Sequence, residues 1–287
     1  FQVGLAGIIL NSTGVILTFR VRSLCTSFGR LTAVHLSADC AILAIFTFWC
    51  APMTYFSYQD HDSLISRKMG QLSLYFWFVT LYSQLFIALN RFTLLFCPRI
   101  YMEFFQCRTS SLILLYNLIC VGHICVYFGE GCDFYYNAET YFWEFAETPC
   151  ESAISFWLDL VYGCVTSYVL LLIDVICVAN MRMNASKLAN PVSANERKIR
   201  SDREWRFLAQ ACCTELLFSF MLISFHVVSR YVSGLWPTFF STSLIWKLSH
   251  LGNGIILFAF NQELRRAILQ PKMLFSFSTI TDTKAKT

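Results

Sequence analysis

The amino-acid sequence predicts an all-α integral membrane protein, a bundle of seven transmembrane helices. Of its 287 residues, 56% are hydrophobic and only 14% are charged, against about 25% charged residues in an average soluble domain. A soluble core of this length could not bury so much apolar surface, because soluble proteins keep a charged shell. Seven windows of about 20 mostly apolar residues, each long enough to cross a bilayer, give the number of helices.

The seven windows follow one another closely and leave no room for a separate folded domain. In chain order they are Phe1–Phe19, Leu31–Thr54, Met69–Phe92, Ser111–Phe128, Ser152–Asn180, Phe207–Val232 and Phe239–Phe260. Each ends where a polar gap begins, at 20–30, 55–68, 93–110, 129–151, 181–206 and 233–238. The first window is apolar from its first residue and lacks a basic start and a cleavage site. We therefore expect an incomplete first membrane helix rather than a signal peptide.

The basic residues predict the orientation of the bundle. All but four of the 22 Lys and Arg lie in or beside the gaps after windows one, three and five, or in the tail. Of the four, Arg67 and Lys68 lie in the gap after window two, and Arg230 and Lys247 fall inside windows. The positive-inside rule then places the N-terminus outside and the C-terminus inside. The expected organisation is a membrane domain over 1–268 and a cytoplasmic tail over 269–287.

The longest outer gap, Gly129–Glu151, carries six acids and no base. This composition fits either a solvated loop or a lid that attracts cations and polar ligands. Cys132 and Cys150 lie in this gap, on the oxidising side of the membrane. Because Thr54–Leu95 contains no cysteine that could join the loop to helix three, we expect the two to bond to each other. That bridge would add about 3 kcal/mol of stability by restricting the unfolded chain.

Four polar residues inside the windows need an explanation, because an ionisable group within a membrane span costs about 3 kcal/mol or more. They are Asn11, Asp39, Arg91 and Asn253, in helices one, two, three and seven. Buried polar groups of a bundle tend to bond to one another, so structural pairing could explain each of them alone. Their order along the chain is more informative.

This order resembles the rhodopsin-like G-protein-coupled receptors. Asn11 matches the family's helix-one asparagine, and Asp39 matches its helix-two aspartate, the usual sodium-site residue. Asn253 resembles the start of the helix-seven motif Asn-Pro-x-x-Tyr. The resemblance therefore allows a sodium ion at Asp39 and implies no other cofactor and no metal.

The cytosolic ends of the helices carry the same resemblance. The triplet Asn90, Arg91 and Phe92 resembles the Asp-Arg-Tyr motif, and Pro98 and Tyr101 follow at the family's spacing. Asn261–Ile268 resembles the family's short amphipathic eighth helix, with Leu264 and Ile268 on its apolar face.

Several departures from the general pattern narrow the family. Asn90 replaces the motif's aspartate, Gly254 replaces its proline, and Leu257 replaces its tyrosine. Together with the outer-loop phrases Cys132–Tyr136 and Phe145–Cys150 and the phrase Asn253–Ile256, they resemble the nematode serpentine chemoreceptors of class X. The similarity covers nearly the whole chain.

The resemblance implies a chemosensory receptor rather than an enzyme. It would sit in the plasma membrane, for instance of a sensory cilium, bind an extracellular small-molecule or pheromone-like ligand, and activate a heterotrimeric G protein. Arg91 would hold the inner ends of helices three and six together at rest, and the neutral Asn90 predicts a weaker resting lock. Glu215 is either a substitute partner for Arg91 or faces Gln210 or water. The bases between Arg182 and Arg206 either contact lipid or the G protein or only set topology.

The ligand pocket is expected to open outward between helices three, five, six and seven, with Asp159 and Arg230 close enough to pair. The candidate lining residues are aromatic or titratable: Tyr75, Asp159, Tyr162, His226, Arg230, Trp246 and Lys247.

Lys247 has three interpretations. Its position six residues before Asn253 matches the retinal-binding lysine of opsins, but helix three offers no acid as counterion to a Schiff base. It could instead be a pocket base for an acidic ligand or a structural lysine.

Other classes of protein are less well supported by the sequence. A transporter or ligand-gated channel could use Asp39 and Asp174, but no Gly- or Pro-interrupted spans accompany them. No enzyme motif occurs, and nothing indicates a nucleic-acid partner. His35, His123, His226 and His250 are scattered over four windows, and their spacing predicts no cluster.

Overall fold

The structure is a computed structural model that describes residues 1–21, 24–56, 63–187 and 194–269. Seven helical segments in it are long and apolar enough to cross a membrane. They are Gln2–Arg20, Ser27–Tyr55, Leu64–Phe96, Pro98–Phe128, Pro149–Met183, Ala209–Arg230 and Leu235–Phe260. Each contains or overlaps one predicted window, so the seven-helix bundle is confirmed. The orientation of the termini stays a prediction.

Several spans are composed of more than one helix, because π-helical or 3-10 turns interrupt them. The first three spans are α1 (Gln2–Arg20), then α2 (Ser27–Ile45), η2 (Phe46–Cys50) and α3 (Ala51–Tyr55), then α4 (Leu64–Phe96). The fourth is α5 (Pro98–Ile100), η3 (Tyr101–Gln106), α6 (Cys107–Cys125) and η4 (Val126–Phe128). The rest are α7 (Pro149–Ile154), η5 (Ser155–Val161) and α8 (Tyr162–Lys187), then α9 (Ala194–His226) and η6 (Val228–Arg230), then α10 (Leu235–Phe239), η7 (Phe240–Leu244) and α11 (Ile245–Phe260).

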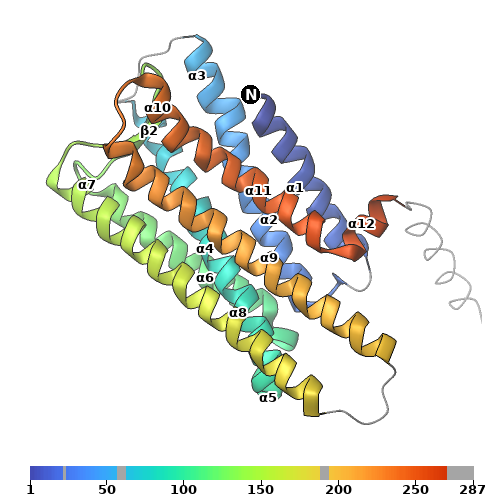
Figure 1. Cartoon of the computed structure of the whole chain (residues 1–287). Helices are drawn as coiled ribbons and strands as arrows, with labels where there is room; N and C mark the ends of the chain where they lie inside the picture. Colours follow the sequence, from blue (N-terminus) through green and yellow to red (C-terminus); the bar gives the residue numbers. More distant parts are fainter. Residues whose placement is uncertain (22–23, 57–62, 188–193, 270–287) are drawn as a thin grey trace, which may run out of the picture.

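The two ends of the bundle differ (Figure 1). The N-terminus, α3, α7 and α10 lie at one end. It is called here the hairpin end, because the β-hairpin between the fourth and fifth spans also lies there. α5 and α12 lie toward the other end, called the α12 end. α12 (Gln262–Leu269) is the expected eighth helix, and Leu264 and Ala267 are its buried residues. Ile268, predicted on the apolar face, is instead 48% exposed. Ala267 occupies the packed position.

Short polar side chains start three of the helices. Thr26, Ser63 and Thr148 each accept a hydrogen bond from the backbone N–H three residues later, at the first turns of α2, α4 and α7. These bonds satisfy N–H groups that lack a partner within the helix. α9 begins at Ala194, earlier than the predicted window Phe207–Val232.

The loop Gly129–Glu151 adds a feature that the all-α prediction missed, a two-stranded antiparallel hairpin. β1 (Phe134–Asn137) pairs with β2 (Phe142–Phe145), with Phe134 opposite Phe145. The predicted disulfide between Cys132 and Cys150 is present, with a Cα–Cα separation of 5.5 Å. The disulfide therefore joins Cys132, which precedes β1, to Cys150 in α7, and so closes the loop that contains the hairpin.

The hairpin is part of the hydrophobic core. Phe134 and Trp143 are each 2% exposed and belong to the same buried cluster as Trp77 and Trp246. At Gly70 on α4, a Cβ atom would collide with the Phe134 carbonyl, so only glycine lets β1 approach this closely. The aromatic hairpin thus fills the hairpin end of the bundle.

Candidate functional site

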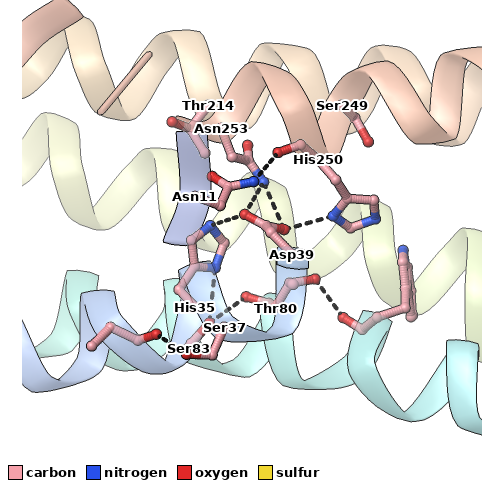
Figure 2. A network of polar contacts seen from close by, with 12 residues as sticks. Asn11, His35, Ser37, Asp39, Thr80, Ser83, Thr214, Ser249, His250 and Asn253 are labelled. Carbon is pink, nitrogen blue, oxygen red and sulfur yellow. Dashed lines mark hydrogen bonds and ion pairs between the residues drawn. The ribbon is translucent and has the colours of Figure 1, made fainter. Parts of the chain in front are cut away.

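Asp39 is the centre of a polar cluster in the middle of the bundle. It is fully buried on α2, and His250 Nδ1 of α11 lies 2.6 Å from its Oδ1. Asn253 Nδ2, one turn further along α11, donates to both carboxylate oxygens at 3.3–3.4 Å. His35, one turn earlier on α2, places Nε2 3.4 Å from Oδ2 (Figure 2). The carboxylate is therefore held by three side chains from two helices.

The cluster extends to two further helices. His35 Nδ1 lies 2.9 Å from the hydroxyl of Ser83 on α4, and that hydroxyl donates to the Thr80 carbonyl at 2.8 Å. Asn11 of α1 donates from Nδ2 to the His250 carbonyl at 3.2 Å. A Cβ at Gly254 would collide with the Asn11 side chain, so glycine in place of the family's proline permits this approach. The cluster thus joins α1, α2, α4 and α11.

The structure corrects the expectation that the histidines form no cluster, since His35 and His250 both reach Asp39. The spacing of each histidine from a polar residue on its own helix could have predicted this cluster. His35 precedes Asp39 by four residues and His250 precedes Asn253 by three, which places each pair on one helix face. The sodium ion expected at Asp39 stays a prediction, and it would meet a carboxylate that already contacts these side chains.

Arg91 forms an ion pair near the α12 end. Its Nη2 lies 2.9 Å from Asp174 Oδ1 and donates to Oδ2 at 3.1 Å, linking α4 to α8. Glu215 of α9, considered above as the partner of Arg91, is not in the pair, although both line one cavity. The acid that the sequence lacks at Asn90 is therefore supplied by Asp174 from helix five of the bundle.

The remaining residues of the predicted switch separate into two groups. Asn90 donates from Nδ2 to Ser27 Oγ at 2.8 Å, and that hydroxyl lies 3.4 Å from the Tyr101 hydroxyl. Ser27 of α2 therefore links Asn90 to Tyr101. Phe92 instead stacks on Phe96, at 4.6 Å between ring centroids. Pro98 begins α5 and lines a surface hollow.

One cavity connects the Asp39 cluster to the ion pair. It is lined at one side by His35 and Asn253 and at the other by Arg91, Asp174 and Glu215. The two polar centres are therefore neighbours across a space in the α12 half of the bundle, and a shift of one helix would alter both.

Three of the predicted pocket residues come together at the hairpin end. Asp159 of η5, His226 of α9 and Trp246 of α11 line one cavity, with Asp159 Oδ2 3.0 Å from His226 Nε2. The ring of Phe134 in the hairpin closes this cavity from the side of the loop. The predicted pairing of Asp159 with Arg230 is wrong, because His226 takes that place.

The other predicted pocket residues face elsewhere. Tyr75 donates to Asn117 Oδ1 at 2.7 Å, and the Tyr162 hydroxyl lies 2.6 Å from that of Tyr82. Arg230 is exposed in η6. Lys247 is half-buried with Nζ 5.0 Å from the centroid of the Phe46 ring. Among the described residues no carboxylate lies within ion-pair distance of Lys247, so a retinal Schiff base there would lack a counterion.

Aromatic side chains of the hairpin, which are not among the predicted pocket residues, pack beside this cavity, and Phe134 lines it. Trp143 stacks on Phe134 at 5.2 Å and meets Trp246 edge-on at 5.8 Å. The Tyr136 hydroxyl lies 2.6 Å from Thr54 Oγ1, and burial raises the pKa of that hydroxyl above its ordinary value. The available signal was the density of aromatic residues in Phe134–Tyr136 and Phe142–Phe145, because aromatic residues are enriched in strands.

Comparisons with known proteins agree on one group. The family model described as "Serpentine type 7TM GPCR chemoreceptor Srx" matches residues 1–261. Serpentine receptor class X 45 of Caenorhabditis elegans is 25% identical over 268 residues, covering 88% of this chain and 74% of that protein. The crystal structure of squid rhodopsin superposes with a TM-score of 0.75 at 15% identity, covering 95% of this chain and 83% of that chain. The last likeness concerns the fold alone.

Proposed function

This chain belongs to the serpentine 7TM chemoreceptor family Srx, and from that premise we propose that it binds an extracellular small molecule and activates a heterotrimeric G protein. The family and the fold support a chemosensory G-protein-coupled receptor in the coarse sense. In our proposal the hairpin end faces outside and receives the ligand. The α12 end faces the cytosol and receives the G protein.

The partly buried ion pair between Arg91 and Asp174 is the observation that carries the proposal. It ties α4 to α8 beside the cavity that Glu215 of α9 also lines. A closed bundle keeps this pair, and a bundle whose α12 end opens releases Arg91 toward an incoming partner. A ligand that favours the open arrangement shifts the population toward it in proportion to its differential affinity for the two states.

Two helices can transmit the ligand's effect. α11 carries Trp246 at the hairpin-end cavity and both His250 and Asn253 at Asp39. α9 carries His226 at the same cavity and Glu215 at the cavity beside Arg91. A small displacement of α11 beside the ligand would therefore move side chains at Asp39, and a small displacement of α9 would move Glu215 beside Arg91.

The test is ligand-independent signalling of Asp174→Asn in cells that express the whole chain with a G-protein reporter. Removing the acid frees Arg91, so we expect basal signalling to rise several-fold over the parent at equal surface expression. Arg91→Ala should remove signalling altogether. Glu139→Gln, which deletes an exposed acid in the hairpin turn, is the control and should match the parent. Equal basal signalling of Asp174→Asn and Glu139→Gln would contradict the proposed lock.

A further inference from the structure

Two carboxylates are buried at the hairpin end on one face of the fifth span. Glu151 lies in α7 and Asp159 in η5, eight residues or about two helical turns apart, with Ser155 between them. Glu151 is 0% exposed and Asp159 is 6% exposed. Such burial is unusual, because carboxylates almost never lie fully inside a protein unless they are paired.

Three of the four oxygens of these carboxylates lack a hydrogen-bond partner in the described part of the chain. Neither oxygen of Glu151 accepts a hydrogen bond there, and neither does Asp159 Oδ1. The buried Tyr127 hydroxyl is also without a partner among the described residues, and it interacts electrostatically with both acids. An unpaired buried carboxylate costs several kcal/mol, so it takes up either a proton or a cation.

No lysine or arginine among the described residues lies within ion-pair distance of Glu151 or Asp159. Arg230 is exposed, and Lys247 has its Nζ 5.0 Å from the centroid of the Phe46 ring. Arg67 lies 3.6 Å from Asp133, and Lys68 donates to Gln71 Oε1 at 2.9 Å. His226 already lies between Asp159 Oδ2 and the Ser155 hydroxyl, at 3.0 and 3.3 Å. No basic side chain among the described residues therefore contacts the free oxygen, Asp159 Oδ1.

The cavity beside Asp159 has a volume of only ≈ 20 Å³ in this arrangement, so a ligand would have to widen it by displacing its walls. Those walls suit a cation with an apolar body. The aromatic lining of the cavity consists of Trp77, Phe134, Phe225 and Trp246, and its aliphatic lining of Leu74, Met221 and Leu222. Aromatic faces attract an ammonium group by their quadrupole, most strongly when it is desolvated. The apolar part of the same molecule would lie against the aliphatic side chains.

We propose that this cavity binds an organic ammonium ion, whose N–H groups donate to Asp159 Oδ1 while its hydrocarbon part packs among Trp77, Phe134 and Trp246. Glu151 interacts electrostatically with Asp159, and its ionised form strengthens the negative potential at the ammonium group. The uncharged Tyr127 hydroxyl adds none. The inference rests on the proposed function only in taking this cavity as the ligand site. It adds the chemical class of the ligand.

The experiment measures thermal unfolding of the purified whole chain in lipid nanodiscs. The probes are butylammonium, phenethylammonium and tryptammonium, each beside the neutral alcohol of the same shape, with phenylacetate as the anionic probe. We expect at least one ammonium probe to raise Tm with a saturable concentration dependence, and its matched alcohol and phenylacetate to do so far less. If no ammonium probe exceeds its alcohol, the proposal is overturned.

Two variants identify the anchor. Asp159→Asn should weaken the apparent affinity of the active probe about 10- to 100-fold, the range for one hydrogen bond to a charged group. Glu151→Gln should weaken it less, and Glu139→Gln, the same charge change at an exposed position, should leave it nearly unchanged. Equal affinity in Asp159→Asn and Glu139→Gln would overturn the assignment. If Asp159→Asn does not fold, Glu151→Gln decides, and an affinity equal to that of Glu139→Gln overturns it.

Infrared difference spectra give a second readout. Binding an ammonium ion to Asp159 should change a carboxyl band that is absent from the spectrum of Asp159→Asn. Probe binding that fails to elicit any G-protein response would count against the proposed function and leave the ammonium site standing. If neutral ligands signal equally through the parent and Asp159→Asn and no ammonium ion binds, the ammonium site is overturned and the proposed function stands.

Discussion

At the scale of the residue, the Asp39 cluster shows what a resemblance can and cannot predict. Asp39 and Asn253 each match a position of the family pattern, and the structure brings them within hydrogen-bonding distance. The histidines match no motif, and only the rotation of each helix about its axis directs them to the carboxylate. Their partners come from different spans, whose mutual rotation a single sequence does not specify.

The cluster predicts a strong energetic coupling between Asp39 and His250. His250→Phe leaves the fully buried Asp39 without its closest partner and should cost about 3–5 kcal/mol of unfolding free energy. In the Asp39→Asn background the same change should cost at least about 1 kcal/mol less. Thermal unfolding of the two single variants and the double variant measures the coupling. Additive costs would mean that the contact contributes nothing to stability.

At the scale of the element, the hairpin is the part of the fold that sequence reasoning missed. A loop with six acids looks solvated, yet Phe134, Tyr136 and Trp143 point into the bundle while Glu144 stays on the other face. The disulfide could be predicted from the compartment and the absence of another cysteine. The strands could not, because four residues are too few to establish a period against a background so rich in aromatics.

The two faces of β2 should respond differently to truncation. Trp143→Ala removes a 2% exposed indole from the aromatic cluster and should cost about 3–5 kcal/mol. Phe142→Ala, one residue earlier on the opposite face and only partly buried, should cost clearly less. Comparing their Tm values with the parent tests the register of the hairpin, and equal losses would contradict it.

The disulfide should stabilise the same element. Cys150→Ser opens a loop of 18 residues and should cost about 3 kcal/mol, and a reducing agent should then cause no further loss. Cys25→Ser, at an exposed free cysteine, is the control and should leave Tm unchanged. A Cys150→Ser protein as stable as the Cys25→Ser protein would show that the bridge adds nothing.

At the scale of the whole molecule, hydrophobic windows were sufficient to predict the seven spans, because the bilayer imposes a length on every one of them. The ion pair between Arg91 and Asp174 was beyond reach for a different reason. Its two residues are 83 positions apart and lie in spans three and five of the bundle, so the contact depends on how all the helices pack.

The loop charges make a prediction about the whole molecule that epitope tags can check. A tag at the C-terminus should bind antibody only in permeabilised cells, and a tag in the hairpin turn at Glu139 should bind antibody on intact cells. Antibody binding with the opposite pattern would invert the orientation. It would also move the proposed ligand site to the cytosolic side.

The aromatic hairpin has a kinetic consequence. Phe134 lines the hairpin-end cavity and packs on Trp143 and Trp246, so the ligand proposed above would have to displace these rings to enter. Association should then be slower than an unobstructed encounter, and bound ligand should leave slowly for the same reason. A receptor built in this way responds to how long a compound persists more than to brief pulses of it.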